Sequence, residues 1–241
     1  MSTTRKSWDN FEAMRAAAQE GDAQAQCYLG VCYQNGQGLE QNHQEAVKWF
    51  RRSAEQNDPV AQCYLGVCYW IGQGVPQEFG EAAKWLREAA EQGDPAAQFN
   101  LGMLYETGQG VALNYPEAVK WYRESAQRGY PAAQFNLAVF YESGQVVGQN
   151  YAEAVRWYLA AAQQELADAQ CNLGLCYQTG RGVEKNPGEA VRWFIKAARQ
   201  GNKTAQHNLG LHYAAVEAAE KQAMRLAAEK AAREGVPEEP V

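Results

Sequence analysis

The sequence lacks several features that would place it in a familiar class of proteins. No run of apolar residues approaches the roughly 20 that a membrane-spanning helix needs, so no membrane insertion is expected. Positive charge is not in excess, because 22 Lys and Arg stand against 28 Asp and Glu, and this disfavours a nucleic-acid-binding surface. The polar residues 1–8 contain no apolar segment of the kind that a secretory signal carries, so we expect a cytoplasmic protein.

Groups for catalysis and metal binding are scarce as well. Histidine occurs only as His43, His207 and His212. No Walker loop, Gly-x-Ser-x-Gly elbow or His-Glu-x-x-His motif is present. We therefore expect a protein that is not an enzyme, with no catalytic residue, no cofactor and no metal site.

What the sequence does contain is a repeat of 36 residues. A step of 36 from Leu29 meets a leucine five times in succession, and the same step from Tyr33 meets a tyrosine five times. Gln26 and Trp49 begin similar columns, and no insertion disturbs the period between residues 22 and 213. Columns of identical residues at one period indicate a repeat architecture, in which each unit packs on its neighbours.

Each unit is expected to fold as two helices. In the first, helix A, Ala25, Leu29 and Tyr33 recur at the four-residue spacing of one helix face. An Asp before helix A is a preferred N-cap, and the Gly-x-Gly loop after it suits the positive φ of a helix end. The second, helix B, begins with Asn-x-x-Glu, a capping-box pattern, as at Asn42 and Glu45.

A glycine also recurs inside helix A, where it costs roughly 1 kcal/mol relative to alanine. The column consists of Gly30, Gly66, Gly102, Gly174 and Gly210, with Ala138 as the exception. A cost repeated in this way implies that the two helices of a unit approach each other closely. We expect the tryptophan of helix B to cover the notch that the glycine leaves.

The period predicts complete units between irregular ends. The complete units are residues 22–57, 58–93, 94–129, 130–165 and 166–201. Before them, residues 1–21 resemble a lone helix B and are expected to cap the first unit. After them, residues 202–234 are a sixth, degenerate unit with a capping helix, either one long helix or a tight helix pair over residues 214–234. Residues 235–241 are expected to be a loose acidic tail.

The combined pattern resembles the Sel1-like repeat, a relative of the tetratricopeptide repeat. It consists of Ala-Gln-x-x-Leu-Gly-x-x-Tyr, Gly-x-Gly, Glu-Ala-x-Lys/Arg-Trp and Ala-x-x-Gly, and it extends over residues 22–213. The resemblance implies an all-α fold, a right-handed α-solenoid of stacked helix-turn-helix repeats. It also implies a protein–protein interaction scaffold or adaptor that binds a peptide or protein partner on the concave face, which helix A lines in solenoids of this kind.

The same resemblance leaves other functions open. Penicillin binding and weak β-lactamase activity are attributed to cysteine-rich Helicobacter proteins that look like this family, and other relatives are bacterial effectors or regulators. In the Helicobacter proteins disulfides join helix B of one unit to helix A of the next, whereas all six cysteines here fall in helix A. Because other copies of the repeat carry Phe, Leu or His at these two positions, we interpret the cysteines as small core residues.

Two groups of residues are the candidate partner-binding surface. One is a column on the strip of helix A that is left for solvent, and it reads Tyr28, Tyr64, Asn100, Asn136, Asn172 and Asn208. Its amides either bind an extended peptide at regular steps or hydrogen-bond nearby groups of the fold. The other is Trp70 and Ile71, which interrupt two otherwise polar columns and are either a partner anchor or local packing.

Overall fold

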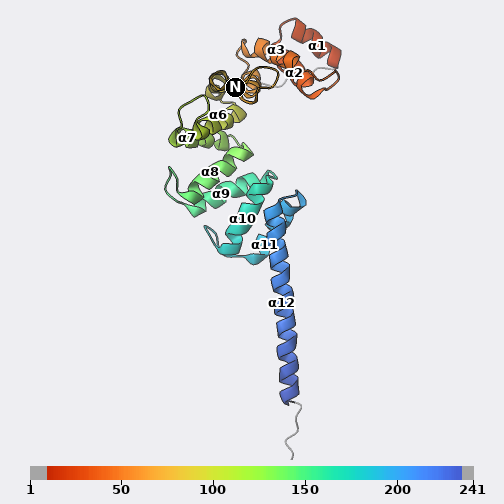
Figure 1. Ribbon diagram of the computed structural model, residues 1–241, viewed down its shortest axis with the longest axis vertical. Helices are drawn as coiled ribbons and strands as arrows, with labels where there is room; N and C mark the ends of the chain where they lie inside the picture. Colours follow the sequence, from red (N-terminus) through yellow and green to blue (C-terminus); the bar gives the residue numbers. More distant parts are fainter. Residues whose placement is uncertain (1–9, 235–241) are drawn as a thin grey trace, which may run out of the picture. The chain divides into compact units, whose positions relative to one another are not determined.

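The computed structural model describes residues 10–234, with side chains described up to residue 230 (Figure 1). This part of the chain is built of α-helices joined by short loops and contains no strand, so the expected all-α repeat fold is confirmed. The expected acidic tail, residues 235–241, lies outside the described residues. The helices are α1 (Phe11–Gln19), α2 (Ala23–Asn35), α3 (His43–Ala54), α4 (Pro59–Ile71), α5 (Phe79–Glu91), α6 (Pro95–Thr107), α7 (Tyr115–Gln127), α8 (Pro131–Ser143), α9 (Tyr151–Gln163), α10 (Ala167–Thr179), α11 (Pro187–Arg199) and α12 (Lys203–Glu234).

The helices alternate between the two kinds that the repeat predicts. Even-numbered helices from α2 to α12 carry the sequence of helix A, and odd-numbered helices from α3 to α11 carry that of helix B. The chain divides into two compact units, residues 1–150 with α1–α8 and residues 151–241 with α9–α12. Within each unit every helix packs on the helices before and after it in the chain. Such contacts between sequence neighbours are those of a repeat protein.

The ends of helix A form as the sequence predicts. The Asp22 carboxylate accepts a hydrogen bond from the backbone N–H of Ala25 at 2.9 Å, and Asp58 and Asp94 cap α4 and α6 in the same way. At the other end, α2, α4, α6, α8 and α10 each stop at a glycine with φ between 69° and 79°. This left-handed conformation costs a residue with a Cβ more than it costs glycine, so the glycine ends the helix.

The start of helix B is only half of the expected capping box. The side chain of Asn42 accepts a hydrogen bond from the backbone N–H of Glu45 at 3.0 Å, as expected. The reciprocal bond is missing, because the Asn42 N–H donates instead to the carbonyl of Tyr33, at 2.8 Å. The Glu45 carboxylate is therefore left to pair with Lys48 Nζ, at 2.6 Å. Each loop is thus tied back to the tyrosine column of helix A, a contact that the local sequence pattern did not reveal.

The notch at the glycine inside helix A is filled by the residue after the tryptophan, so the expected cover was wrong. A Cβ added to Gly30 would lie 2.6 Å from the ring of Phe50, and one added to Gly102 would lie 2.8 Å from the ring of Tyr122. Trp49 instead packs, partly buried, against a cluster that α1 and α2 form. Successive side chains on a helix point about 100° apart, so the tryptophan and its successor reach different neighbours.

A buried glutamine of helix A joins each repeat to the preceding one. The side chain of Gln62 donates to the carbonyl of Ala54 at the end of α3, and it accepts from Gln92 at the end of α5, at 2.7 Å. One amide therefore connects three helices. The bond to the preceding helix recurs at 3.1–3.3 Å from Gln26, Gln62, Gln98, Gln134 and Gln170.

The last helix, α12, is one continuous helix, so of the two forms left open by the sequence the structure has the single helix. Its first part packs on α11, where Ala205 is fully buried. From Tyr213 to Lys230 every residue is exposed. The notch at Gly210 is open, because among residues 10–234 no separate helix B packs against it. Within the described residues, no helix combines the length and the apolar character that crossing a membrane requires.

Candidate functional site

The tyrosines of the candidate column differ in their surroundings. Tyr28 on α2 is exposed over 49% of its surface. Tyr64 on α4 is half-buried, and its ring stacks on that of Phe50 of the preceding helix, with centroids 4.9 Å apart and planes within 7°. Tyr64 therefore packs between two repeats, while about half of the surface of Tyr28 is exposed.

The asparagines of the column are half-buried and, in the first unit, contact the preceding repeat. The amide of Asn100 lies 3.9 Å from the sulfur of Cys63, and the amide of Asn136 hydrogen-bonds the hydroxyl of Tyr122. In the second unit Asn172 and Asn208 are also half-buried. Both observed contacts belong to the fold, so the use of these amides as a ladder for a bound peptide stays a prediction.

Tyr122 is the centre of a small buried polar cluster. Its hydroxyl donates to a carboxylate oxygen of Glu106 on α6, and its ring is fully buried over Gly102. Burial, and after it the hydrogen bond to Glu106, raise the pKa of Tyr122 far above its usual range. A neutral phenol that is hydrogen-bonded on both sides stabilises the packing of α6, α7 and α8, and we assign it no catalytic role.

Trp70 lies between repeats rather than in an open position. Its ring packs against the core clusters of both the first and the second repeat, and its indole N–H donates to the side chain of Gln109 at 2.7 Å. The equivalent residue one repeat earlier, Gln34, donates to Gln73 at 3.2 Å in the same way. This position thus joins a helix to the next Gly-x-Gly loop, and the use of Trp70 as a partner anchor stays a prediction. Ile71, by contrast, is exposed over 56% of its surface.

The structure adds two residues, Val60 and Val67, to the sequence candidates Tyr64 and Ile71 on one face of α4. We call this face the α4 strip, and it consists of Val60, Tyr64, Val67 and Ile71. The spacing of four, three and four residues places these side chains on one face of α4. Val60 is 38% exposed and Ile71 is 56% exposed, while the other two are half-buried. The spacing was visible in the sequence, but α4 is apolar on other faces too, so only the structure separates this face from the core.

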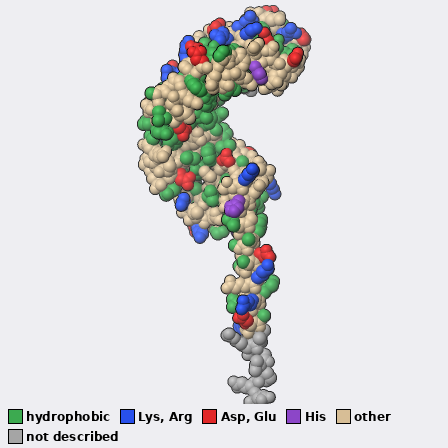
Figure 2. Space-filling view, viewed as in Figure 1, with side chains coloured by type: hydrophobic (Ala, Val, Ile, Leu, Met, Phe, Trp, Pro, Cys, Tyr) green, Lys and Arg blue, Asp and Glu red, His purple; other side chains and the backbone are tan. Residues whose placement is uncertain are grey.

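Apolar side chains also occupy positions equivalent to Tyr64 and Val67 in other repeats of the first unit. Tyr28 on α2 and Val139 on α8 are exposed over 49% and 39% of their surfaces, and Met103 on α6 is half-buried. Figure 2 shows charges of both signs scattered over the first helices and hydrophobic side chains gathered over the helices of the first unit that follow. At the position of Ile71 the other complete repeats carry the polar residues Asn35, Thr107, Ser143 and Thr179, while at the position of Val60 they carry Gln24, Ala96, Ala132 and Asp168.

The cysteines are buried and do not form disulfides with one another. All six are thiols within the core. Burial raises the pKa of Cys68 to about 11, and it also raises that of Cys63, so both thiols are protonated at neutral pH. Among the described residues, no three His, Cys, Asp or Glu side chains come together as metal ligands. The cysteines therefore act as small apolar residues of the packing.

Comparison with known proteins identifies the repeat. Successive segments of the chain match a protein family described as Sel1 repeat, and the matched residues are 23–58, 59–94, 95–130, 131–166 and 167–202. No curated protein sequence matches the chain.

Solved structures agree with this match. A Sel1 repeat protein from Oxalobacter formigenes is 36% identical with a TM-score of 0.77, and the alignment covers 85% of this chain and 90% of that protein. The protein c5321, described as a protective antigen of uropathogenic Escherichia coli with an SLR fold, is 36% identical with a TM-score of 0.76. That alignment covers 83% of this chain but only 43% of c5321. The immunity protein Pa5087 from Pseudomonas aeruginosa, 20% identical with a TM-score of 0.54 over 81% of this chain and 75% of its own, shares the fold.

Proposed function

Because the chain belongs to the Sel1 repeat family, we propose that it is a non-enzymatic scaffold that binds a protein partner through the helix A face of its first unit. Sel1 repeats typically serve as protein–protein interaction scaffolds. The observation that carries the proposal is the α4 strip, whose ends, Val60 and Ile71, stay exposed although the neighbouring repeats are in place. Contiguous apolar surface of this kind is typical of a site for a partner.

The composition of the surface favours an extended peptide or a protein edge with apolar side chains. Such a segment crosses the α4 strip on the concave side of the solenoid, with its large side chains on Val60 and Ile71. Tyr28 supplies a ring at one side, and the amides of Asn100 and Asn136 supply donors and acceptors at the other. In the second unit Asn172 and Asn208 occupy the equivalent positions of helix A and are proposed as partner-binding residues there. In this proposal Trp70 packs against the core clusters next to the α4 strip and does not contact the partner.

The proposal includes a cytoplasmic location and excludes the penicillin-binding activity of the cysteine-rich relatives. Six buried thiols support both points. Thiols persist in reducing compartments, and the disulfides between neighbouring units that those relatives contain are not formed here.

Replacing Ile71 by aspartate tests the proposal. The Ile71→Asp variant is expected to lose a specific partner, because it places a charge in the apolar contact, while its free energy of unfolding changes by no more than about 0.5 kcal/mol. The measurement is affinity purification from cells of the source organism, followed by titration calorimetry with the identified partner. Leu113→Asp is the matched control, since Leu113 is 58% exposed but lies in a loop. Equal binding by wild type, Ile71→Asp and Leu113→Asp would show that the α4 strip is not the site.

A further inference from the structure

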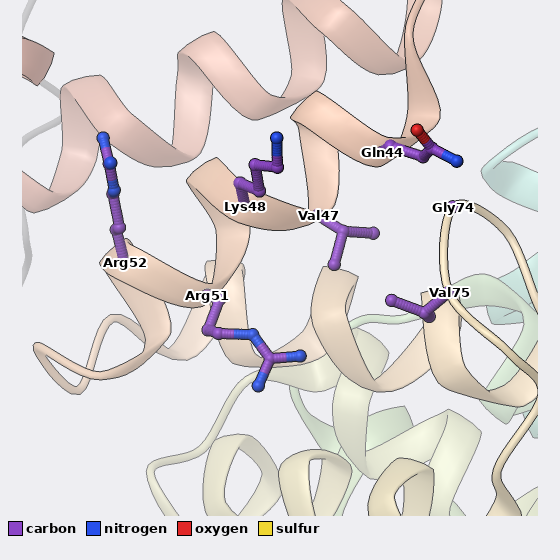
Figure 3. A pocket seen from close by; sticks show the side chains of 7 residues that line it. All are labelled: Gln44, Val47, Lys48, Arg51, Arg52, Gly74 and Val75. Carbon is purple, nitrogen blue, oxygen red and sulfur yellow. The ribbon is translucent and has the colours of Figure 1, made fainter.

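A second surface of the first unit lies on helix B. A hollow of about 460 Å³ opens where α3 faces the loop that follows α4 (Figure 3). Val47 from α3 and Val75 from the loop point toward one another across it. Val47 is buried and Val75 half-buried, so the floor of the hollow is apolar. We call this site the basic hollow because of the side chains at its rim.

Three cationic side chains of α3 lie at the rim of the hollow. Lys48, Arg51 and Arg52 all line the hollow from α3. Lys48 pairs with the carboxylate of Glu45, which neutralises one of the three charges. The rim thus retains a local positive charge on a chain whose formal net charge is −6.

Neutral aromatic groups hold the two guanidinium groups. Arg51 donates to the hydroxyl of Tyr69 and lies 5.8 Å from the centre of its ring. Arg52 lies 4.7 Å from the ring centre of Trp49. In the part of the chain that the structure describes, neither arginine forms an ion pair with a carboxylate. Both guanidinium groups therefore keep their full charge in a restrained position, which lowers the ordering cost of binding an anion.

The same hollow is less basic in the repeats that follow. At the position of Arg52 the second and third repeats carry acids, Glu88 and Glu124, and the fourth carries Ala160. The position of Arg51 is different, because Arg87 one repeat later also donates to a tyrosine hydroxyl, that of Tyr105, at 3.1 Å. The first three repeats thus share an arginine at position 51, whereas the fourth and fifth carry Leu159 and Ile195, and the repeat also forms with an acid at position 52. The charge of Arg52 has no role in forming the repeat.

We propose that the basic hollow binds an acidic segment of a protein partner. One aliphatic side chain of that segment enters between Val47 and Val75, and carboxylates on either side of it pair with Arg51, Arg52 and Lys48. Side chains three and four residues apart on a helix lie about 5–6 Å from each other at Cβ, so the rim matches several carboxylates better than one small anion. The basic hollow shares no residue with the α4 strip, so this inference stands or fails separately from the proposed function.

Fluorescence anisotropy with the full chain tests the inference. The probe is a fluorescein-labelled peptide, Glu-Glu-Leu-Glu-Glu, flanked by glycines. We expect binding that weakens as salt increases, because the rim is exposed. Arg52→Glu is expected to weaken it by about tenfold or more, because like charges then face each other. This variant places in the first repeat the residue that the second and third repeats carry, so the fold tolerates it.

Matched controls separate the basic hollow from general charge effects. Lys196 occupies the position of Arg52 in the fifth repeat and lies 4.4 Å from the ring centre of Trp193, so Lys196→Glu removes the same charge from an equivalent setting. We expect it to leave binding unchanged. A peptide with Gln for Glu, or with Gly for Leu, is expected to bind weakly.

Three results would overturn the inference. The first is an equal loss of binding in Lys196→Glu and Arg52→Glu, which would indicate attraction by net charge alone. The second is equal binding of the Glu and Gln peptides, or none by either. The third is displacement of the probe by inorganic phosphate at concentrations similar to those of the peptide, which would make the basic hollow a site for a free anion.

Discussion

At the scale of single residues, the column that contains Tyr64 and Asn136 makes side-chain contacts with the preceding helix. Where that helix has Phe50, the next helix A places Tyr64 on it as a stacked ring. Where it has Tyr122, the next helix A supplies the amide of Asn136 to the hydroxyl. In both places the side chain of this column contacts the residue that fills the glycine notch of the preceding repeat. A side chain that looks like part of a regular surface ladder in the sequence is also a packing partner in the fold.

Trp70 provides the residue-scale prediction. Replacing it by alanine is expected to lower the free energy of unfolding by about 3 kcal/mol, because the ring packs against two core clusters and its N–H is bonded to Gln109. Urea unfolding followed by circular dichroism measures the change. Ile71→Ala is the control, and its stability should stay close to that of the wild type because the side chain is largely exposed. A Trp70→Ala protein of unchanged stability would show that the indole belongs to a partner-binding surface instead.

At the scale of helices, each element depends on its neighbours more than on its own sequence. Helix A is defined at both ends by local signals, Asp caps and left-handed glycines. Its position is then set by contacts with the helix B on either side, through the filled glycine notch and the buried glutamine. In α12, against which no separate helix B packs within residues 10–234, the notch at Gly210 is open and residues 213–230 are exposed.

Truncation of α12 tests this description. Removing residues 214–241 is expected to leave the urea midpoint unchanged, because residues 214–230 contribute no buried side chain. The helical signal in circular dichroism should fall at the same time. In the full-length protein the exposed part of α12 continues a folded helix and contributes to that signal, and the truncated protein lacks it. The test compares the truncated and full-length proteins in one unfolding experiment. A clearly lower midpoint would mean that this part of α12 packs on another surface in solution.

At the scale of the whole molecule, stability is a sum of similar contacts between neighbours, and the exceptions are local. Gln98 illustrates this, because its side-chain oxygen is buried without a partner. The repeats that complete this bond have Gln56, Gln92 or Gln200 as the donor, whereas the third repeat has Arg128 at that position. A defect of this kind weakens one contact between repeats and leaves the others intact.

The buried thiols predict a pH dependence that both units share. Burial raises the pKa of Cys68 to about 11, and it also raises those of Cys32, Cys63 and Cys171, so each thiol loses its proton more easily in the unfolded chain. Stability from this source is complete below pH about 9 and is lost as the pH rises toward 11, since the unfolded state then binds fewer protons. Urea unfolding between pH 7 and 10 measures the slope, and Cys68→Ala should reduce it. A slope that is the same in Cys68→Ala and wild type would contradict this origin.

Much of the fold was predictable because it depends on signals within a few residues. The 36-residue period, the alternation of two helices, the Asp caps and the left-handed glycines all follow from local backbone chemistry. The candidate site was predictable only in part. Ile71 and Tyr28 are exposed. Trp70 instead donates a hydrogen bond to Gln109 of the next loop, and Tyr64 stacks on Phe50.

The remaining features were decided by the packing of one repeat on the next. Whether Trp49 or Phe50 fills the notch at Gly30, and whether Asn42 donates to Glu45 or to Tyr33, depends on which atoms a neighbouring helix brings within reach. The α4 strip and the basic hollow are set in the same way, since both are the surface left uncovered after the repeats have stacked. Periodicity specifies which side of a helix is apolar, but only the distances between helices determine how much of that side is buried.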